Sequence, residues 1–271
     1  MMREYGLCLW SFGNAPFKRK CKIAKNIGVD GVEVEGNLDQ NPIEIKNILD
    51  EYNLKPLSVT PANVDISSSD KNIREKAVAY FLDLLDWAKE LDTDRICVHG
   101  DVGKVKGSED KDLDWDLLVS STKTIVEKAR RNNILVVFEV LNRYENHQIV
   151  TCKEALDLIK EVNSSNLSIL LDSYHMNIEE KSPSEAIKSA GNKLGVYHVA
   201  DSNRQQIGDG HSNIKEQIKT LHSIDYKGPI IMEMVAQGPN PFTPEKELGY
   251  IEVLSEYYKN SLKLLKKWDF K

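Results

Sequence analysis

Short apolar runs rich in β-branched residues alternate with amphipathic segments along the whole chain, and this alternation restricts the folds open to it. The runs with strand character are Tyr5–Trp10, Gly31–Glu35, Lys55–Thr60, Arg95–His99, a run that starts at Leu135 and contains Glu139, Leu167–Leu171, Leu194–Val199 and Gly228–Met234. The segments with helical spacing are about Phe17–Ile27, Asn41–Tyr52, Asp70–Leu91, Trp115–Asn132, Thr151–Val162, Pro183–Ala190, Asn213–Ile224 and Pro244–Lys266.

Eight strand-then-helix units in 271 residues average about 34 residues each (271/8), which is typical of a (β/α)₈ TIM barrel. A doubly wound open sheet would favour a Gly-rich phosphate loop between a strand and a helix, but Gly28-Val-Asp-Gly31 precedes a strand instead. No Pro/Gly/Ser-rich linker divides the chain. We therefore predict an α/β fold with one TIM-barrel domain over residues 1–271 and an active site at the C-terminal ends of its strands.

Charge and hydropathy argue against several classes of partner. The net charge of −6 disfavours binding to a nucleic-acid backbone, and no apolar run reaches the ~20 residues of a membrane helix. Residues 1–6 lead into a predicted strand, not a signal peptide. The four cysteines are scattered without a Cys-x-x-Cys pair, as expected for reduced thiols. We predict a cytoplasmic protein without nucleic-acid or membrane partners.

Four consecutive predicted strands end on a group that can ionise: Glu139, Asp172, His198 and Glu233. The intervals (172−139 = 33, 198−172 = 26, 233−198 = 35) are each about one unit long, so each strand presents one group to the same mouth of the barrel. A carboxylate in an apolar strand is costly unless a cation meets it. The pattern therefore predicts that these four side chains bind one divalent metal ion.

The donor set and its placement indicate the chemistry. Three carboxylates and one imidazole suit Mn²⁺, Mg²⁺ or Co²⁺ better than Zn²⁺. Glu139 and Glu233 come from the fifth and eighth strands, on opposite sides of the predicted ion. Such a pair could take a proton from one face of a carbon and return one to the other, while the metal polarises a carbonyl and stabilises the enediolate between the steps. This reaction needs no organic cofactor.

Further polar residues follow the same strands, as a neutral, polyhydroxylated small molecule would require. They are Asn142 and Glu145 after Glu139, Tyr174 and His175 after Asp172, and Asp201, Arg204, Asp209 and His211 after His198. For Asp209 and His211, a solvated loop is an equally good interpretation. Trp10, Phe12, Trp115 and Phe242 could supply an apolar wall, although such aromatics more often belong to the core.

Several of these motifs resemble a known family. They are Glu139-Val-Leu-Asn-Arg-Tyr-Glu145, Leu171-Asp-Ser-Tyr-His-Met-Asn-Ile-Glu-Glu180, His198-Val-Ala-Asp-Ser-Asn-Arg204, Gly208-Asp-Gly-His211 and Glu233. Together they resemble the ketose 3-epimerases, the D-tagatose 3-epimerase and D-psicose 3-epimerase group of the xylose-isomerase-like TIM-barrel superfamily. The resemblance is close in the C-terminal half. In the N-terminal half it is limited to the order of units and the helix near 69–91.

The resemblance implies a function and residue roles. It implies epimerisation of ketoses at C3, of the D-psicose/D-fructose or D-tagatose/D-sorbose type, with Glu139 and Glu233 as the acid/base pair. The metal, usually Mn²⁺ or Co²⁺, would be held by Glu139, Asp172, His198 and Glu233. Glu145, His175 and Arg204 would bind the hydroxyls and carbonyl end of the sugar. A homodimer or homotetramer is also implied.

Three alternatives stay open. An aldose–ketose isomerase of the same superfamily would use the same metal site. A zinc nuclease of the endonuclease IV type would share His99, Glu139, Asp172, His175, His198, Asp209, His211 and Glu233, but Lys55-Pro-Leu-Ser-Val-Thr-Pro61 lacks a histidine that its trinuclear zinc set requires. A catalytically silent sugar-binding barrel is the third alternative.

Overall fold

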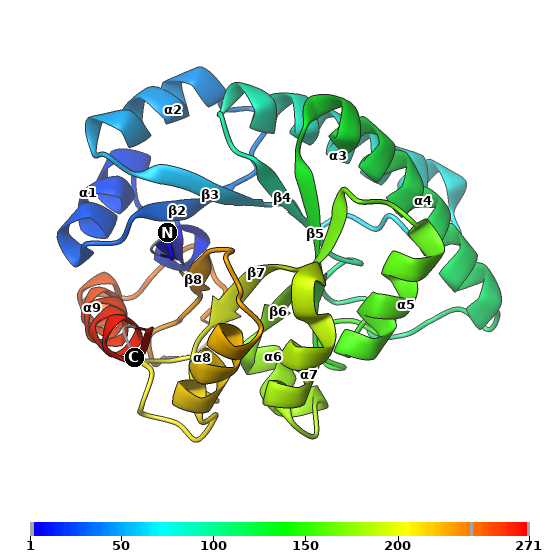
Figure 1. The fold of residues 1–271 in the computed structure, drawn as a ribbon. Helices are drawn as coiled ribbons and strands as arrows, with labels where there is room; N and C mark the ends of the chain where they lie inside the picture. Colours follow the sequence, from blue (N-terminus) through cyan, green and yellow to red (C-terminus); the bar gives the residue numbers. More distant parts are fainter. Residues whose placement is uncertain (1–2, 239–240, 270–271) are drawn as a thin grey trace.

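The computed structural model describes residues 3–238 and 241–269, and it shows eight parallel strands in a nearly closed ring (Figure 1). The strands are β1 Tyr5–Cys8, β2 Gly31–Glu35, β3 Lys55–Thr60, β4 Arg95–Val98, β5 Leu135–Val140, β6 Leu167–Asp172, β7 Leu194–Val199 and β8 Ile230–Met232. The predicted TIM barrel is therefore confirmed. The single domain over 1–271 stays a prediction, and residues 1–2, 239–240 and 270–271 of that range lie outside the described residues.

Neighbouring strands pair in the order β3-β2-β1-β8-β7-β6-β5-β4, so β3 and β4 are the two ends of the ladder. Side chains link these ends: Thr93 Oγ1 donates to the Pro56 carbonyl (3.0 Å), and Arg95 Nη1 donates to the Leu57 carbonyl (3.1 Å). Because β1 pairs with both β2 and β8, the first and last units of the chain lie side by side.

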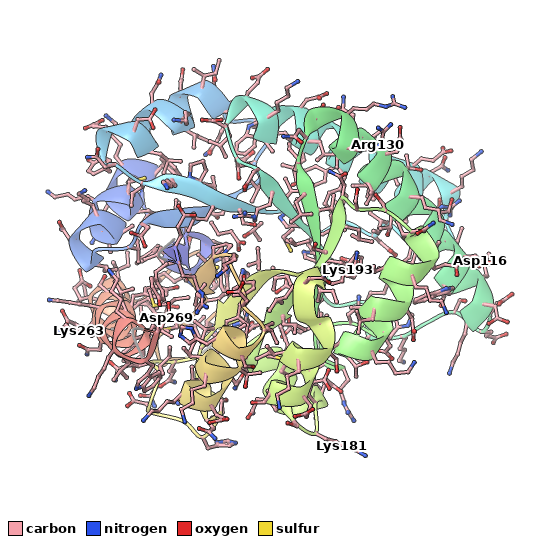
Figure 2. The ribbon with its side chains drawn as sticks, in the orientation of Figure 1. Asp116, Arg130, Lys181, Lys193, Lys263 and Asp269 are labelled. Atoms are coloured by element: carbon pink, nitrogen blue, oxygen red, sulfur yellow. The ribbon has the colours of Figure 1, made fainter. Side chains whose placement is uncertain are left out.

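The helices surround the strands and turn their polar faces outward (Figures 1 and 2). They are α1 Phe17–Ile27, α2 Pro42–Glu51, α3 Lys71–Glu90, α4 Lys111–Asn132, α5 Cys152–Val162, α6 Ser173–Glu179, α7 Pro183–Ala190, α8 Ile214–Ser223 and α9 Tyr250–Asp269. The exposed side chains of Asp116 and Lys181 project from this outer layer in Figure 2. No helix among the described residues has the length and hydropathy to cross a membrane.

Two apolar layers hold the barrel together. The larger one fills the space between strands and helices, as alternation along the strands predicts. The smaller one contains one residue from each of seven strands and lies inside the ring: Cys8, Leu57, Cys97, Val137, Leu170, Val196 and Ile231. We call this inner layer the inner floor, and the side chains at the C-terminal ends of the strands lie next to it.

The structure corrects three predicted boundaries and adds one helix. Trp10 lies in a 3₁₀ turn, Trp10–Phe12, and not in the first strand. The fourth helix begins at Lys111 instead of Trp115, because the Asp110 side chain accepts the Leu113 N–H and caps it earlier. The last helix begins at Tyr250 instead of Pro244, after Gly249 in the left-handed region (φ 84°).

The added helix is α6, which the sequence analysis left out. The Asp172 carboxylate caps its N-terminus by accepting the Tyr174 N–H at 2.8 Å. Asp172 therefore ends a strand and caps a helix at the same time. Seven residues are too few to display a helical period in the sequence, so this helix depends on the cap and its packing.

Candidate metal and sugar site

The strand-end residues are placed by the two-residue period of the strands. Each stands two positions after a residue of the inner floor: Val137 and Glu139, Leu170 and Asp172, Val196 and His198, Ile231 and Glu233. Side chains two apart on a strand point to the same face, so all four point into the barrel above the floor. The parallel register, in which Asp172 is level with His198, brings them to one height.

The structure brings Glu139, Asp172, His198 and Glu233 together, and we call them the strand-end cluster. Each offers a ligand atom, and these atoms all lie within 4.8 Å of one another. All four side chains are buried, and Asp172 Oδ2 has no hydrogen-bond partner among the described residues. Three buried carboxylates and an imidazole, with one carboxylate oxygen lacking a hydrogen-bond partner in the described part of the chain, form a site that could hold a metal ion. The oxygen-rich donor set fits a hard divalent cation.

Protonation in the cluster is uneven. Burial and the neighbouring Glu233 carboxylate raise the pKa of Glu139 to about 8 and that of Asp172 to about 7. Burial acts in the same direction on Glu233, but Arg204 and His198 outweigh it and hold the pKa of Glu233 well below its usual range. The two glutamates of the cluster therefore differ in proton affinity, as an acid and a base must.

Arg204 lies beside the cluster as a buried cation. Its Nη2 donates to Glu233 Oε2 at 2.8 Å, and its guanidinium carbon lies 4.7 Å from the centroid of the Tyr174 ring. Trp10 and Phe242 face the same guanidinium at 5.7 and 5.6 Å, and stack on each other. Nε and Nη1 of Arg204 have no hydrogen-bond partner among the described residues, so their N–H groups could donate to a ligand.

His175 presents a second free donor. Asn142 Oδ1 accepts the Tyr144 N–H and its Nδ2 donates to Glu145, so the amide orientation is fixed. Nδ2 also donates to His175 Nδ1 at 2.8 Å, which leaves the ring proton on Nε2. That nitrogen is buried and unpartnered, 3.7 Å from Asp172 Oδ2 and 3.9 Å from Glu139 Oε1. Its N–H therefore points into the site.

Glu145 completes this side, since its Oε1 lies 3.8 Å from Arg204 Nη1. The three residues predicted to hold the sugar, Glu145, His175 and Arg204, thus lie close together next to the strand-end cluster.

Other predicted candidates lie elsewhere. Phe12 is core, packed on Tyr258, and Trp115 packs against the outer core. His211 is exposed and its Nδ1 pairs with Ser202 Oγ at 2.9 Å. In the part of the chain that the structure describes, neither His211 nor Asp209 joins a group able to hold a metal. A trinuclear zinc set is therefore not assembled by these residues.

Glu33 was not predicted to lie at the site, and Trp10 was considered only for an apolar wall. Trp10 Nε1 donates to Glu233 Oε1 at 2.8 Å, and Glu33 Oε2 lies 3.2 Å from His198 Nε2. Glu33 carried the same signal as Glu139, a carboxylate within an apolar run. The position of Trp10 at the end of the first predicted strand gave no indication of its hydrogen bond to Glu233.

A family model described as "Xylose isomerase-like TIM barrel" matches residues 21–259. An L-ribulose 3-epimerase from Methylomonas sp. is 31% identical, over 85% of this chain and 84% of that protein. A D-psicose 3-epimerase from Ruminiclostridium cellulolyticum is 36% identical, over 64% of this chain. That alignment spans 60% of the relative's own length.

A solved structure of an epimerase shares the fold over almost the whole chain. The D-allulose 3-epimerase from Methylomonas sp. superposes with a TM-score of 0.87 at 26% identity, covering 99% of each chain.

Proposed function

Because the chain belongs to the xylose isomerase-like TIM barrel family, and within it to the ketose 3-epimerases, we propose that it interconverts ketoses that differ in configuration at C3. The observation that carries the proposal is the strand-end cluster. Its two glutamates stand at the ends of the arc β5-β6-β7-β8, and Asp172 and His198 stand between them. Relatives named as 3-epimerases of D-psicose and L-ribulose support the substrate class.

The residues of the cluster would hold one divalent cation, with Mn²⁺ first and Co²⁺ or Mg²⁺ as alternatives on the basis of their oxygen-rich set. When bound, this cation supplies positive charge that polarises the substrate carbonyl and stabilises the negative charge left by proton removal. The proposed proton transfer would need no organic cofactor.

The proton transfer belongs to the two glutamates. One removes the C3 proton, and the other returns a proton to the opposite face, so the configuration inverts. Which glutamate acts first depends on which epimer is bound. Trp10 and Arg204 fix the Glu233 carboxylate through both of its oxygens, and this aims one base at a defined point. Burial keeps water from competing for the proton.

The sugar is held by the free donors and acceptors beside the cluster. Arg204 Nη1 and Nε and the Nε2–H of His175 would donate to its oxygens, and Glu145 would accept from a hydroxyl. The homodimer or homotetramer and the cytoplasmic location stay predictions.

The direct test is a panel of free ketoses with Mn²⁺, with products identified by NMR. D-psicose, D-fructose, D-tagatose, D-sorbose and L-ribulose form a suitable panel. We expect a ketose of inverted C3 configuration from at least one of them. An aldose product would instead assign the site to carbonyl migration between C1 and C2, and no turnover of any ketose would contradict the proposal.

Removal of the sugar-holding groups is expected to weaken substrate binding. Arg204→Ala and His175→Ala should each raise KM by about 10- to 100-fold, because each removes a hydrogen bond from a charged or buried donor worth ~1.5–3 kcal/mol. Arg204→Ala should also lower kcat, since Glu233 loses its cation. Steady-state kinetics on the best ketose would measure both constants.

Matched controls are Arg143→Ala and His211→Ala, an exposed arginine paired with Glu179 and an exposed histidine. Both should keep wild-type kinetics. Unchanged KM in the Arg204 and His175 variants would place the sugar elsewhere.

A further inference from the structure

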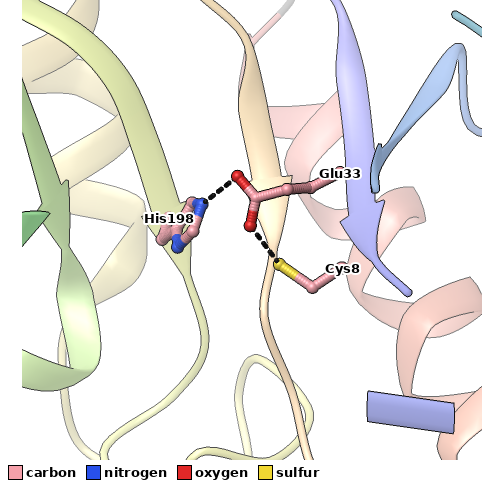
Figure 3. Close-up of side chains that lie close together, drawn as sticks. All are labelled: Cys8, Glu33 and His198. Carbon is pink, nitrogen blue, oxygen red and sulfur yellow. Dashed lines mark hydrogen bonds and ion pairs between the residues drawn. The ribbon is translucent and has the colours of Figure 1, made fainter. Parts of the chain in front are cut away.

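The His198 imidazole is engaged at both ring nitrogens. Nδ1 faces the strand-end cluster, 3.3 Å from Glu233 Oε2 and 3.8 Å from Glu139 Oε1. Nε2 faces the opposite half of the barrel, 3.2 Å from Glu33 Oε2 on β2 (Figure 3). The ring is buried, so its orientation depends on these two contacts.

Glu33 is itself held as a charged acceptor. Its Oε1 accepts from Thr60 Oγ1 at 2.7 Å. Cys8 Sγ donates to the same oxygen at 3.3 Å (Figure 3). Together with His198, the contacts come from β1, β3 and β7, and Glu33 is 1% exposed. Although burial opposes it, the facing His198 lowers the pKa of Glu33. Every close polar neighbour in this set is a donor, so the carboxylate accepts at both oxygens.

Cys8, Glu33 and His198 lie close enough to hold a metal ion themselves, but their arrangement favours support over ligation. A second ion would need a Cys8 thiolate, yet burial and the Glu33 carboxylate raise the pKa of this thiol well above its usual range. A second ion would also have to bind His198 Nε2 after loss of its proton. The same ring already presents Nδ1 to the strand-end cluster. The thiol acts here as a donor to Glu33.

We propose that Glu33 is a positioning residue for the metal site: it accepts the Nε2 proton of His198 and so directs the Nδ1 lone pair into the strand-end cluster. A neutral imidazole has one N–H and one lone pair, and the hydrogen bond made by one nitrogen decides which nitrogen can bind a metal. Such outer carboxylates also make the ligand more basic. The inference rests on the proposed metal site.

The placement explains what the first three strands contribute. The four proposed ligands lie on β5, β6 and β7 and directly after β8, whereas Glu33, Cys8 and Thr60 lie on β1 to β3. In the parallel register Cys8 is level with Glu33, and Gly31 precedes Glu33 by two residues on the inward face. A Cβ atom at Gly31 would lie 2.3 Å from the Lys55 carbonyl oxygen, so the close approach of β3 at this position requires a glycine on β2.

The test compares Mn²⁺ binding by calorimetry in the wild type, Glu33→Gln and Glu33→Asp. We expect Glu33→Gln to weaken Mn²⁺ binding by about 10- to 100-fold, and Glu33→Asp, which keeps the charge, to fall between it and the wild type. The matched control is Glu35→Gln on the same strand, because Glu35 pairs with Lys20 and not with His198. It should bind Mn²⁺ as the wild type does. Circular dichroism and thermal unfolding check that each variant is folded.

A second measurement determines the tautomer of His198 directly in the wild type. ¹⁵N NMR of the histidines in the Mg²⁺-loaded wild type should show His198 with its proton on Nε2 and Nδ1 as the metal-facing nitrogen, with the assignment made from a His198→Gln sample. A proton on Nδ1, or equal Mn²⁺ affinity in wild type and folded Glu33→Gln, would overturn the inference.

The two proposals fail in different ways. A wild type that binds Mn²⁺ but epimerises no ketose would refute the proposed function. The role of Glu33 would then still be decided by comparing the Mn²⁺ affinities of the wild type and the Glu33 variants. A wild type that binds neither Mn²⁺ nor Mg²⁺ would refute both the metal site and the positioning role.

Discussion

Replacement of Glu139 or Glu233 by glutamine is expected to lower kcat for C3 epimerisation by about 10²- to 10⁴-fold, while the chain stays folded. Each amide keeps the size of the side chain but cannot accept a proton, and general acid–base catalysis is worth this much. Both residues are buried in the same cluster, so water from bulk solvent cannot take over their role as base. Bound Mn²⁺ must be measured in each variant, because both residues are also proposed ligands.

Exchange in D₂O separates the two bases. Each single variant keeps one glutamate, so it should still exchange the C3 proton of the epimer that presents this proton to the remaining base. The other epimer should not exchange, and the two variants should show opposite preferences. An exposed glutamate, Glu127, provides the control Glu127→Gln, which should behave as the wild type. Normal turnover in either site variant would exclude the two-base mechanism.

Removal of the metal by EDTA is expected to abolish turnover, and one equivalent of Mn²⁺ per chain should restore it. Without a cation, the buried carboxylates of the strand-end cluster repel one another, and nothing polarises the substrate carbonyl. Calorimetry and elemental analysis would measure the stoichiometry. Three zinc ions per chain would favour the nuclease alternative, and full activity in metal-free protein would contradict the proposal.

The same experiment has a defined pH dependence. Metal binding must displace the protons of Glu139 and Asp172, whose pKa values are about 8 and about 7. Apparent Mn²⁺ affinity should therefore rise from pH 6 to pH 8, by up to about tenfold per pH unit for each proton displaced. In the metal-free protein Glu139 binds a proton that the unfolded chain, with a pKa near 4.5, has lost, so its contribution to stability falls as the pH rises over this range.

A matched pair of variants separates the metal site from general effects of charge. Asp172→Asn removes a buried ligand and should abolish tight Mn²⁺ binding. Asp116→Asn changes an exposed side chain on the outer surface (Figure 2) and should leave the affinity unchanged. Equal affinities in the two variants would place the ion outside the strand-end cluster.

The sequence by itself determined the barrel and the members of the strand-end cluster, because both depend on short-range periodicity. An apolar residue followed two positions later by an acid or imidazole fixes which side chains face inward, and the parallel strands bring them to one edge. Val137 with Glu139 and Ile231 with Glu233 show this directly. The residues that would hold the sugar, by contrast, were indicated by resemblance to a family and not by their spacing.

Only the tertiary structure decided which groups meet across the barrel. Glu33 and His198 are 165 positions apart and come from β2 and β7, so no local pattern connects them. Arg204 adopts a left-handed backbone (φ 58°) and meets rings from three separate segments, Trp10, Tyr174 and Phe242. The physical reason is that strand periodicity sets the direction of a side chain, whereas closure of the sheet into a ring sets its partner.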